Sequence, residues 1–156
     1  MENSTKKKIA GVSVACVALI AAYEGFVNHT YKDPVGIPTI GYGHTGKDVK
    51  YGQKITKDEA KTLLQSDATK HWNEASKYIK VEVSQGERDA YTSFIYNVGV
   101  GSFKNSALLK KLNQGKHSEA CAELKKWVYA KGKKLPGLVK RRNAEYNMCM
   151  GGVNGS

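Results

Sequence analysis

Three side chains with complementary chemistry lie near the start of the sequence: Glu24, Asp33 and Thr39. Hydrolysis of a glycosidic bond needs one carboxylic acid to protonate the leaving oxygen and a second group that assists water. Glu24 directly follows an apolar run, residues 9–23, and apolar neighbours favour the protonated acid. Asp33 adjoins Lys32 in a polar loop, which favours its charged form. We therefore predict Glu24 as a general acid, with Asp33 and Thr39 holding a water on the opposite face of the sugar, an arrangement that gives inversion.

A purely structural interpretation of these residues competes with the catalytic one. Asp33-Pro34 is a common turn sequence, and Thr39 is an ordinary strand residue. A glutamate after an apolar run often marks only the end of a helix. Spacing alone therefore does not establish catalysis.

The composition limits the class of protein and its partners. A chain of 156 residues is long enough for one domain with a real core. Its 25 Lys and Arg against 14 Asp and Glu give a formal net charge of +11, which favours nucleic acid, anionic lipid or a polyanionic cell envelope. Aromatic residues are not interleaved with the basic ones, and no nucleic-acid motif is present. We therefore expect no nucleic-acid partner.

The cysteines and histidines do not suggest a metal site. Cys16, Cys121 and Cys149 show no C-x-x-C spacing, and the four histidines are scattered, so we expect no metal and no cofactor. In an oxidising compartment two cysteines can pair and one is left over. Cys121 and Cys149 fall on two expected helices of one lobe and are the candidates for a disulfide.

The apolar run has a basic start. Lys6, Lys7 and Lys8 precede residues 9–23, which is the charge pattern of an export signal. At ~1.5 Å per residue the run spans roughly 22 Å, short of the ~30 Å hydrocarbon core of a bilayer, and many of its residues are small. We therefore interpret residues 1–23 as an uncleaved, weakly inserting anchor that later becomes an N-terminal helix of the soluble fold.

Three other interpretations of this segment remain open. A cleaved signal peptide lacks an A-x-A site before Glu24, and a lipoprotein signal ending at Cys16 lacks the usual leucine. A buried core helix is compatible with the length of the run.

The rest of the sequence indicates a small β region followed by helices. Residues 26–50 combine Gly and Pro turns with β-favouring residues, which predicts short strands. Capping-box spacings at Thr56 and Ser84, with apolar residues at helical spacing, predict the helices that follow. The expected helices are residues 56 to about 78, 84–98, 105 or 106 to 112, 118–128, and 138 to about 149.

This order predicts a mostly helical α+β protein. The β region and the later helices would form two lobes with an active-site cleft between them. Residues 24–150 would be the catalytic domain, and residues 151–156 a flexible tail.

The motif E-x8-D-x5-T, leading into TIGYGHTG at residues 39–46, resembles the catalytic signature of phage lysozymes, glycoside hydrolase family 24. Later segments resemble the helical lobe of that family, at residues 94–103, 106–115, 123–128 and 137–145. The resemblance covers nearly the whole chain after the anchor. It implies a lysozyme-like fold and an inverting muramidase that cleaves the β-1,4 bond between N-acetylmuramic acid and N-acetylglucosamine in peptidoglycan.

The resemblance also implies roles for individual residues. Glu24 is the acid, and Asp33 with Thr39 positions the water. The residues that lie where the family shapes its substrate cleft are Gly41, Tyr42, His44 and Asn97. His44 has a second interpretation, which we favour, in which it buttresses the hairpin near Glu24 instead of touching sugar.

The N-terminal segment resembles the signal-anchor-release subgroup of these endolysins. In that subgroup the host export machinery delivers the enzyme, and the inner membrane tethers it, inactive, on the periplasmic side. Collapse of the membrane potential then frees it into the periplasm to lyse the host. The resemblance implies peptidoglycan, the inner membrane and the export machinery as partners of a monomeric enzyme.

Some members of the subgroup are switched by disulfide exchange between an anchor cysteine and one in the active site. This sequence departs from that pattern because no cysteine lies between Glu24 and Thr39. We expect Cys16 to stay free or to exchange with a Cys121–Cys149 bridge after release. The alternative is that Cys16 is simply a small apolar residue.

Two other classes of function remain open. One is a membrane-tethered peptidoglycan-binding protein whose acid pair is inert. The other is a basic, membrane-permeabilising antimicrobial protein that acts through its charge and its N-terminal helix.

Overall fold

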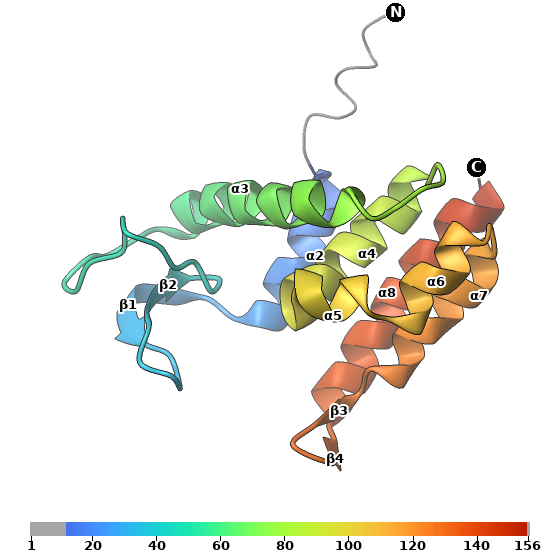
Figure 1. Cartoon of the computed structure of the whole chain (residues 1–156). Coiled ribbons are helices and arrows are strands. Elements are labelled where there is room, and N and C mark those ends of the chain that lie inside the picture. The colour runs from blue at the N-terminus through green and yellow to red at the C-terminus, as the bar shows by residue number, and fades with distance from the viewer. Residues whose placement is uncertain (1–11, 156) are drawn as a thin grey trace, which may run out of the picture. The chain divides into compact units, whose positions relative to one another are not determined.

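The computed structural model describes residues 12–155, and the chain divides at Thr69 into two compact units, Met1–Thr69 and Lys70–Ser156 (Figure 1). We refer to them as the first and the second unit. Short antiparallel hairpins accompany the helices, so the predicted mostly helical α+β architecture with a small β region is confirmed. The predicted basic start of the anchor, its first apolar residues and Ser156 lie outside the described residues.

The described part of the first unit opens with helix α2 (Val14–Glu24). The Ser13 hydroxyl oxygen accepts a hydrogen bond from the Cys16 amide (3.1 Å) and so satisfies one of the N–H groups that a helix start leaves without intrahelical partners. Cys16 and Ile20 are buried. The helix predicted within residues 9–23 is therefore present from Val14 onwards. No helix among residues 12–155 is both long enough and apolar enough to cross a membrane.

A β-hairpin follows α2. Strand β1 (Val27–Lys32) pairs antiparallel with β2 (Pro38–Gly41), and the register places Tyr31 opposite Thr39. The last pair joins Lys32 to Pro38, so the connecting loop starts at Asp33. The hairpin therefore holds two of the predicted catalytic residues at the same end of its two strands.

Helix α3 (Lys57–Ser76) begins at the capping box predicted at Thr56. The Thr56 hydroxyl accepts a hydrogen bond from the Glu59 amide (3.1 Å), and the Glu59 carboxylate accepts one from the Thr56 amide (2.9 Å). Ala60 and Leu64, one helical turn apart, are buried and form the start of its apolar face. The division between the two units falls within this helix.

The second unit is a set of helices around an apolar core. Its most deeply buried side chains include Tyr91, Phe94, Phe103, Leu108 and Leu112. Its elements are α4 (Gln85–Val98), α5 (Val100–Lys104), α6 (Ala107–Asn113), α7 (His117–Glu123), the 3-10 turn η1 (Leu124–Lys126), β3 (Tyr129–Ala130), β4 (Lys133–Lys134) and α8 (Pro136–Gly155).

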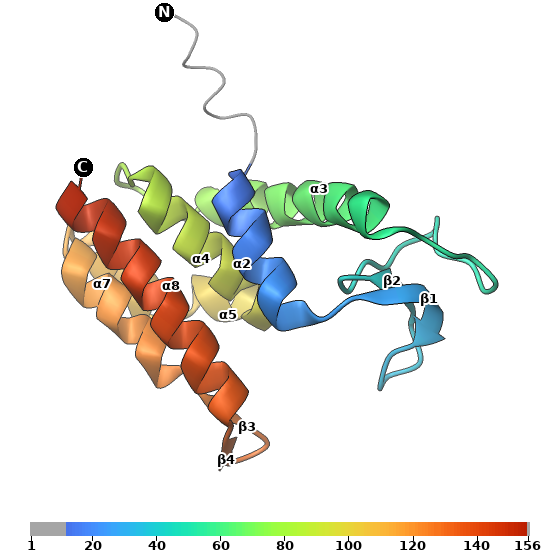
Figure 2. The same ribbon diagram turned by 180° about the vertical axis from the view of Figure 1, so that it is seen from behind.

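Helices α4 and α8 lie along each other (Figure 2). At the start of α4 the two backbones approach so closely that glycine is needed. A Cβ atom on Gly86 would lie 2.8 Å from the Cα atom of Gly152. The capping box predicted at Ser84 is present at this point, with Glu87 as its second member.

Some boundaries in the second unit differ from the sequence prediction. Helix α8 continues to Gly155, so the predicted flexible tail is wrong for residues 151–155. The reason is that Gly152 is packed against α4 and does not mark the end of a helix. The helix predicted for residues 118–128 begins at His117 without a side-chain cap and ends in η1. The β3–β4 hairpin was not predicted, because it lies between the expected helices of residues 118–128 and 138–149 and each of its strands has only two residues.

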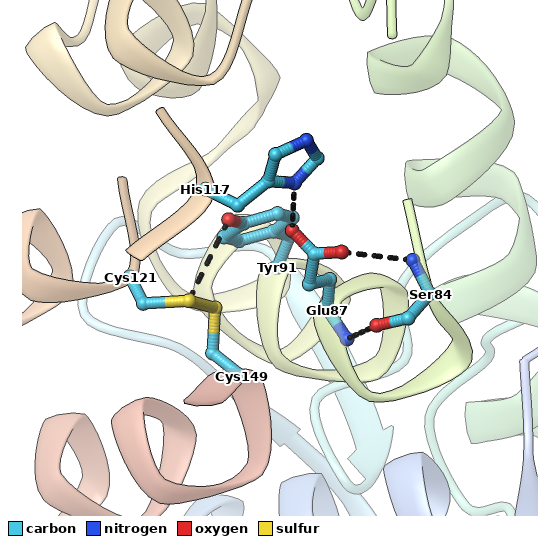
Figure 3. The surroundings of a disulfide bond; sticks show 6 residues. All are labelled: Ser84, Glu87, Tyr91, His117, Cys121 and Cys149. Carbon is cyan, nitrogen blue, oxygen red and sulfur yellow. Dashed lines mark hydrogen bonds and ion pairs between the residues drawn. A yellow bond between two sulfur atoms is a disulfide. The ribbon is translucent and has the colours of Figure 1, made fainter. Parts of the chain in front are cut away.

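The disulfide predicted between Cys121 and Cys149 is present and joins α7 to α8. Figure 3 shows it beside Tyr91, whose hydroxyl lies 4.0 Å from the Cys121 sulfur. Burial and the nearby charge of Glu87 raise the pKa of Tyr91, so its phenol remains neutral. Cys16 is buried and keeps its thiol, and its exchange with this bridge stays a prediction.

A buried ionic network also ties α4 to α8. The Glu145 carboxylate is fully buried and accepts hydrogen bonds from Arg142 (2.9 Å), Ser93 (2.6 Å) and Arg141 (3.3 Å). Arg142 donates as well to the Trp127 carbonyl (2.8 Å). Burial of charge is tolerated when each ion has a partner, as in this network.

Loss of the disulfide should lower stability. Cys121 and Cys149 are 28 residues apart, and closing a loop of that size removes about 3–4 kcal/mol of unfolded-state entropy in the chain-entropy model. We expect dithiothreitol to lower the free energy of unfolding of a Cys16→Ala protein by about that amount in urea denaturation. The matched control is the Cys16→Ala/Cys121→Ala/Cys149→Ala protein, in which the reductant should change nothing. Equal unfolding midpoints of the Cys16→Ala protein with and without reductant would contradict this expectation.

Glu145→Gln should destabilise the protein strongly, because it leaves the Arg142 guanidinium buried without its carboxylate. Removing one partner of a buried ion pair costs about 3–5 kcal/mol. Exposed Glu74 gives the matched control, and Glu74→Gln should stay within about 0.5 kcal/mol of wild type. Urea unfolding followed by circular dichroism measures both. If the two variants unfold at the same urea concentration, the network does not stabilise the fold.

Candidate active site

Glu24 is the last residue of α2, at the junction with the β-hairpin. The next residue, Gly25, has φ +78, a left-handed conformation that glycine adopts without steric penalty. Strand β1 begins three residues after Glu24, at Val27. The Glu24 side chain is half-buried. The structure thus has the predicted acid at the end of an apolar helix, directly before a hairpin.

Asp33 begins the loop that connects β1 to β2, and its side chain organises this loop. Its Oδ1 atom accepts hydrogen bonds from the backbone amides of Val35 (2.9 Å) and Ile37 (2.8 Å). Its own amide donates to the Ile37 carbonyl (3.0 Å). Its second oxygen, Oδ2, accepts no hydrogen bond from any residue between 12 and 155. One oxygen is therefore used to hold the turn, and the other is available to a water.

Thr39 is attached to the same backbone. Its hydroxyl donates to the Ile37 carbonyl (2.9 Å), the carbonyl that also accepts from the Asp33 amide. Only 4% of Thr39 is exposed, so its hydroxyl is fixed in place. Because its hydrogen is used, Thr39 has only lone pairs to offer to a further partner. Asp33 and Thr39 are thus brought together through Ile37.

Gly41 and Tyr42 lie in the interior of the first unit. Gly41 has φ +71, and a Cβ atom there would lie 3.2 Å from the Ala60 Cβ, so this glycine lets β2 approach α3. Tyr42 is buried, and its ring packs on Phe26 with centroids 5.5 Å apart. These contacts shape the hairpin itself.

His44 is a buttress of the hairpin. Its backbone exchanges two hydrogen bonds of 2.9 Å with Ile40. Its ring lies between two carboxylates, with Nδ1 2.7 Å from Asp67 on α3 and Nε2 3.0 Å from Asp48. Burial lowers the pKa of His44, but the hydrogen bonds and charges of Asp67 and Asp48 outweigh this effect and raise the pKa above its ordinary value. These contacts hold the hairpin against α3, and a role of His44 toward sugar stays a prediction.

Sequence reasoning missed Asp48 and Asp67 as partners of His44. Asp48 lies four residues after His44, a spacing that occurs by chance in many loops. Asp67 is 23 residues away on a different element. Only the folded path of the chain brings it to the imidazole, so no local signal could have identified it.

Asn97 belongs to the second unit, at the end of α4. Its side-chain oxygen accepts a hydrogen bond from the Arg142 guanidinium, which connects it to the buried ionic network. Its side-chain NH₂ group donates to no residue among 12–155 and is available as a donor. A role of Asn97 in shaping a substrate cleft stays a prediction.

A pocket of about 390 Å³ lies in the first unit, next to the hairpin. Ile40 and His44 line it, together with residues of the loop before α3 and of the first turns of α3. Because neighbouring residues of a strand point to opposite faces, Ile40 and this pocket lie on the face of β2 opposite the Thr39 side chain. The pocket is thus separate from the groups proposed to hold water. Within the described part of the chain, no three His, Cys, Asp or Glu side chains are grouped as metal ligands would be.

Comparison with known proteins gives a family match and close relatives. The family model described as phage lysozyme matches residues 21–145. The chain is 40% identical to the SAR-endolysin of Bacteriophage PS119 over 159 aligned positions, which cover 97% of this chain and 95% of that protein. It is 44% identical to the SAR-endolysin of Enterobacteria phage P21 over 129 positions, 83% of this chain and 78% of that protein.

Solved structures agree with these sequence matches. A mutant of P22 lysozyme superimposes with a TM-score of 0.81 at 33% identity, covering 90% of this chain and 98% of the other. The muramidase domain of SpmX from Asticaccaulis excentricus gives a TM-score of 0.82 at 29% identity, covering 89% and 97%. The predicted lysozyme-like fold is therefore confirmed.

The contacts of His44 predict a pH-dependent stability. The folded-state pKa is raised above the unfolded value of about 6.5, so the folded state binds the proton more tightly. This stabilisation is fully present below pH 6.5 and is lost as the pH rises through the folded-state pKa. We expect the wild-type free energy of unfolding to fall over that range, measured by urea denaturation at a series of pH values.

Variants of the carboxylates separate this effect from other titrations. Asp67→Asn should flatten the pH dependence most, because Asp67 is largely buried beside the ring. Asp48→Asn should have a smaller effect, since the Asp48 side chain is 66% exposed and its charge is screened by water. A His44→Gln protein that keeps the wild-type slope would disprove the assignment.

Proposed function

The chain belongs to the phage lysozyme family, and on that premise we propose that Glu24, Asp33 and Thr39 carry out its reaction. As a member of this family it is a glycoside hydrolase, a lysozyme. The bond cleaved is the β-1,4 linkage between N-acetylmuramic acid and N-acetylglucosamine in peptidoglycan. The resulting loss of the cell wall lyses the host bacterium.

Glu24 is the proposed proton donor. It gives its proton to the glycosidic oxygen as the bond from that oxygen to the sugar C1 breaks, and it is left as a carboxylate. Its place at the end of α2, directly before the hairpin that carries Asp33 and Thr39, supports this role.

Asp33 and Thr39 are proposed to hold the attacking water. The water donates one hydrogen to Asp33 Oδ2 and the other to the Thr39 oxygen, which leaves its own lone pair for the sugar C1. Asp33 takes up the proton that the water loses as the new bond forms. Attack from the face opposite the leaving oxygen inverts the configuration at C1.

The observation that carries this proposal is the shared attachment of Asp33 and Thr39 to Ile37. The loop uses Asp33 Oδ1 and the Thr39 hydrogen and leaves acceptor positions on both side chains. A water that donates both hydrogens to two fixed acceptors keeps a lone pair that can be directed at a third atom.

We further propose that the N-terminal segment is a membrane anchor from which the enzyme is released. The names of the PS119 and P21 relatives, SAR-endolysin, support this proposal. The host export machinery would deliver the chain to the inner membrane, where it stays inactive on the periplasmic side until release into the periplasm as a monomer. The small and apolar residues of α2 are compatible with weak insertion followed by packing as a helix.

Glu24→Gln should abolish hydrolysis, because glutamine has no proton to give to the leaving oxygen. We expect release of reducing sugar from purified peptidoglycan to fall by about 10²–10⁴-fold. Thr39→Val keeps the shape of the side chain but removes the acceptor, so it should cost less than Glu24→Gln. Proton NMR of the first product should detect the α-anomer.

Exposed Glu74 again gives the matched control, and Glu74→Gln should hydrolyse at the wild-type rate. An inert peptidoglycan-binding protein would release no sugar in any variant. A membrane-permeabilising protein would lyse cells equally well with Glu24→Gln. Either result would overturn the proposed reaction.

A further inference from the structure

The β3–β4 hairpin carries exposed side chains that the proposed reaction does not use. Tyr129 pairs with Lys134, and Ala130 pairs with Lys133. The two residues between the strands, Lys131 and Gly132, have φ values of +52 and +78, as in a type I′ turn. The hairpin leads directly into the start of α8, at one end of the second unit (Figures 1 and 2).

The hairpin is a cluster of uncompensated positive charge. No acidic residue occurs between Glu123 and Glu145. Lys131, Lys133 and Lys134 are exposed, and their side chains form no hydrogen bond or ion pair with any part of the chain from residue 12 to residue 155.

Other basic groups of this segment are already engaged. Lys126 pairs with Glu123 (2.8 Å), and the Lys125 ammonium lies 4.0 Å from the centre of the Tyr146 ring. Arg142 is buried in its pair with Glu145. Lys131, Lys133 and Lys134 therefore carry the positive charge of this segment that is available to bind another molecule.

Apolar side chains accompany these lysines. Tyr129 is 62% exposed and Leu135 is 38% exposed. Residues that pair directly across a hairpin share a face, so Tyr129 lies beside Lys134. A tyrosine beside a lysine is typical of the interface between water and a lipid bilayer, where the ring lies at the level of the headgroups and the ammonium contacts phosphate.

The conformation of Lys131 also points to a use for its charge. The first position of a type I′ turn strongly favours Asn, Asp or Gly, because other residues adopt a positive φ only at a steric cost. Here a lysine occupies that position, with φ +52. Lys131 lies at the tip of the hairpin, between the two strands.

We propose that the β3–β4 hairpin docks on an anionic phospholipid surface. Lys131, Lys133 and Lys134 bind headgroup phosphates, while Tyr129 and Leu135 enter the interfacial layer. A polyanionic cell-wall polymer would satisfy the lysines as well, but it offers no apolar layer for the two other side chains. The observed combination therefore favours lipid.

The test measures binding of the full chain to vesicles of phosphatidylcholine with 30% phosphatidylglycerol, and to vesicles of phosphatidylcholine alone, by co-sedimentation at low salt. Each lysine near such a surface contributes about fivefold in affinity, so Lys131→Gln/Lys133→Gln/Lys134→Gln should bind on the order of a hundredfold more weakly to the anionic vesicles. Tyr129→Ser should also weaken binding, by several-fold. Neither change should affect the thermal midpoint by more than a few degrees, because these side chains are exposed.

A matched triple variant distinguishes the hairpin from overall charge and from the N-terminal segment. Lys77, Lys80 and Lys116 are exposed in the same unit but outside the hairpin. Their triple substitution by glutamine removes the same charge and should cause a much smaller loss of binding. Equal losses in the two triple variants, or no loss in the hairpin variant, would overturn the proposal. So would a hairpin variant that loses affinity for purified cell wall but not for the vesicles.

Discussion

The backbone of Ile37 is the constraint on which the candidate site depends. Its amide donates to the Asp33 carboxylate, and its carbonyl accepts from the Asp33 amide and from the Thr39 hydroxyl. A flexible loop would allow both side chains to turn toward solvent and to bind water in any direction. Here backbone hydrogen bonds hold Asp33 Oδ1 and the Thr39 hydroxyl hydrogen. The directions of Asp33 Oδ2 and of the Thr39 lone pairs are therefore fixed. His44 extends this constraint, because it joins β2 through Ile40 and α3 through Asp67.

Features of the site that depend on local sequence could be predicted. Glu24 at a helix end, the loop start at Asp33 and the capping boxes at Thr56 and Ser84 each involve residues within a few positions of one another. The shared role of Ile37 was not predicted, because an isoleucine backbone has no distinctive sequence signal. The His44–Asp67 contact also depends on tertiary structure, and the position of Asn97 on the ionic network depends on α8 lying beside α4.

Glycine had several meanings that the sequence alone did not separate. Gly25 follows the end of a helix with a positive φ, as expected of a terminating residue. Gly152 lies inside α8, where the close approach of α4 leaves no room for a side chain. Gly132 lies in the turn of a hairpin for which the sequence predicted no element. The role of each glycine depends on its surroundings in the fold. The sequence prediction therefore failed where the glycine allows close helix packing or a hairpin turn.

The position of Glu24 couples the proposed acid to the packing of its helix. Cys16, Val17 and Ile20 are buried, and their burial requires α2 to lie in its place in the fold. If residues 9–23 are held in a membrane, those side chains are withdrawn and the backbone that carries Glu24 is withdrawn with them. The hairpin that holds Asp33 and Thr39 has its own hydrogen bonds and does not need α2 to form them. A single movement of one helix would thus move the proposed acid relative to the proposed water-binding pair, which is enough to account for an inactive state in the proposed tethered form.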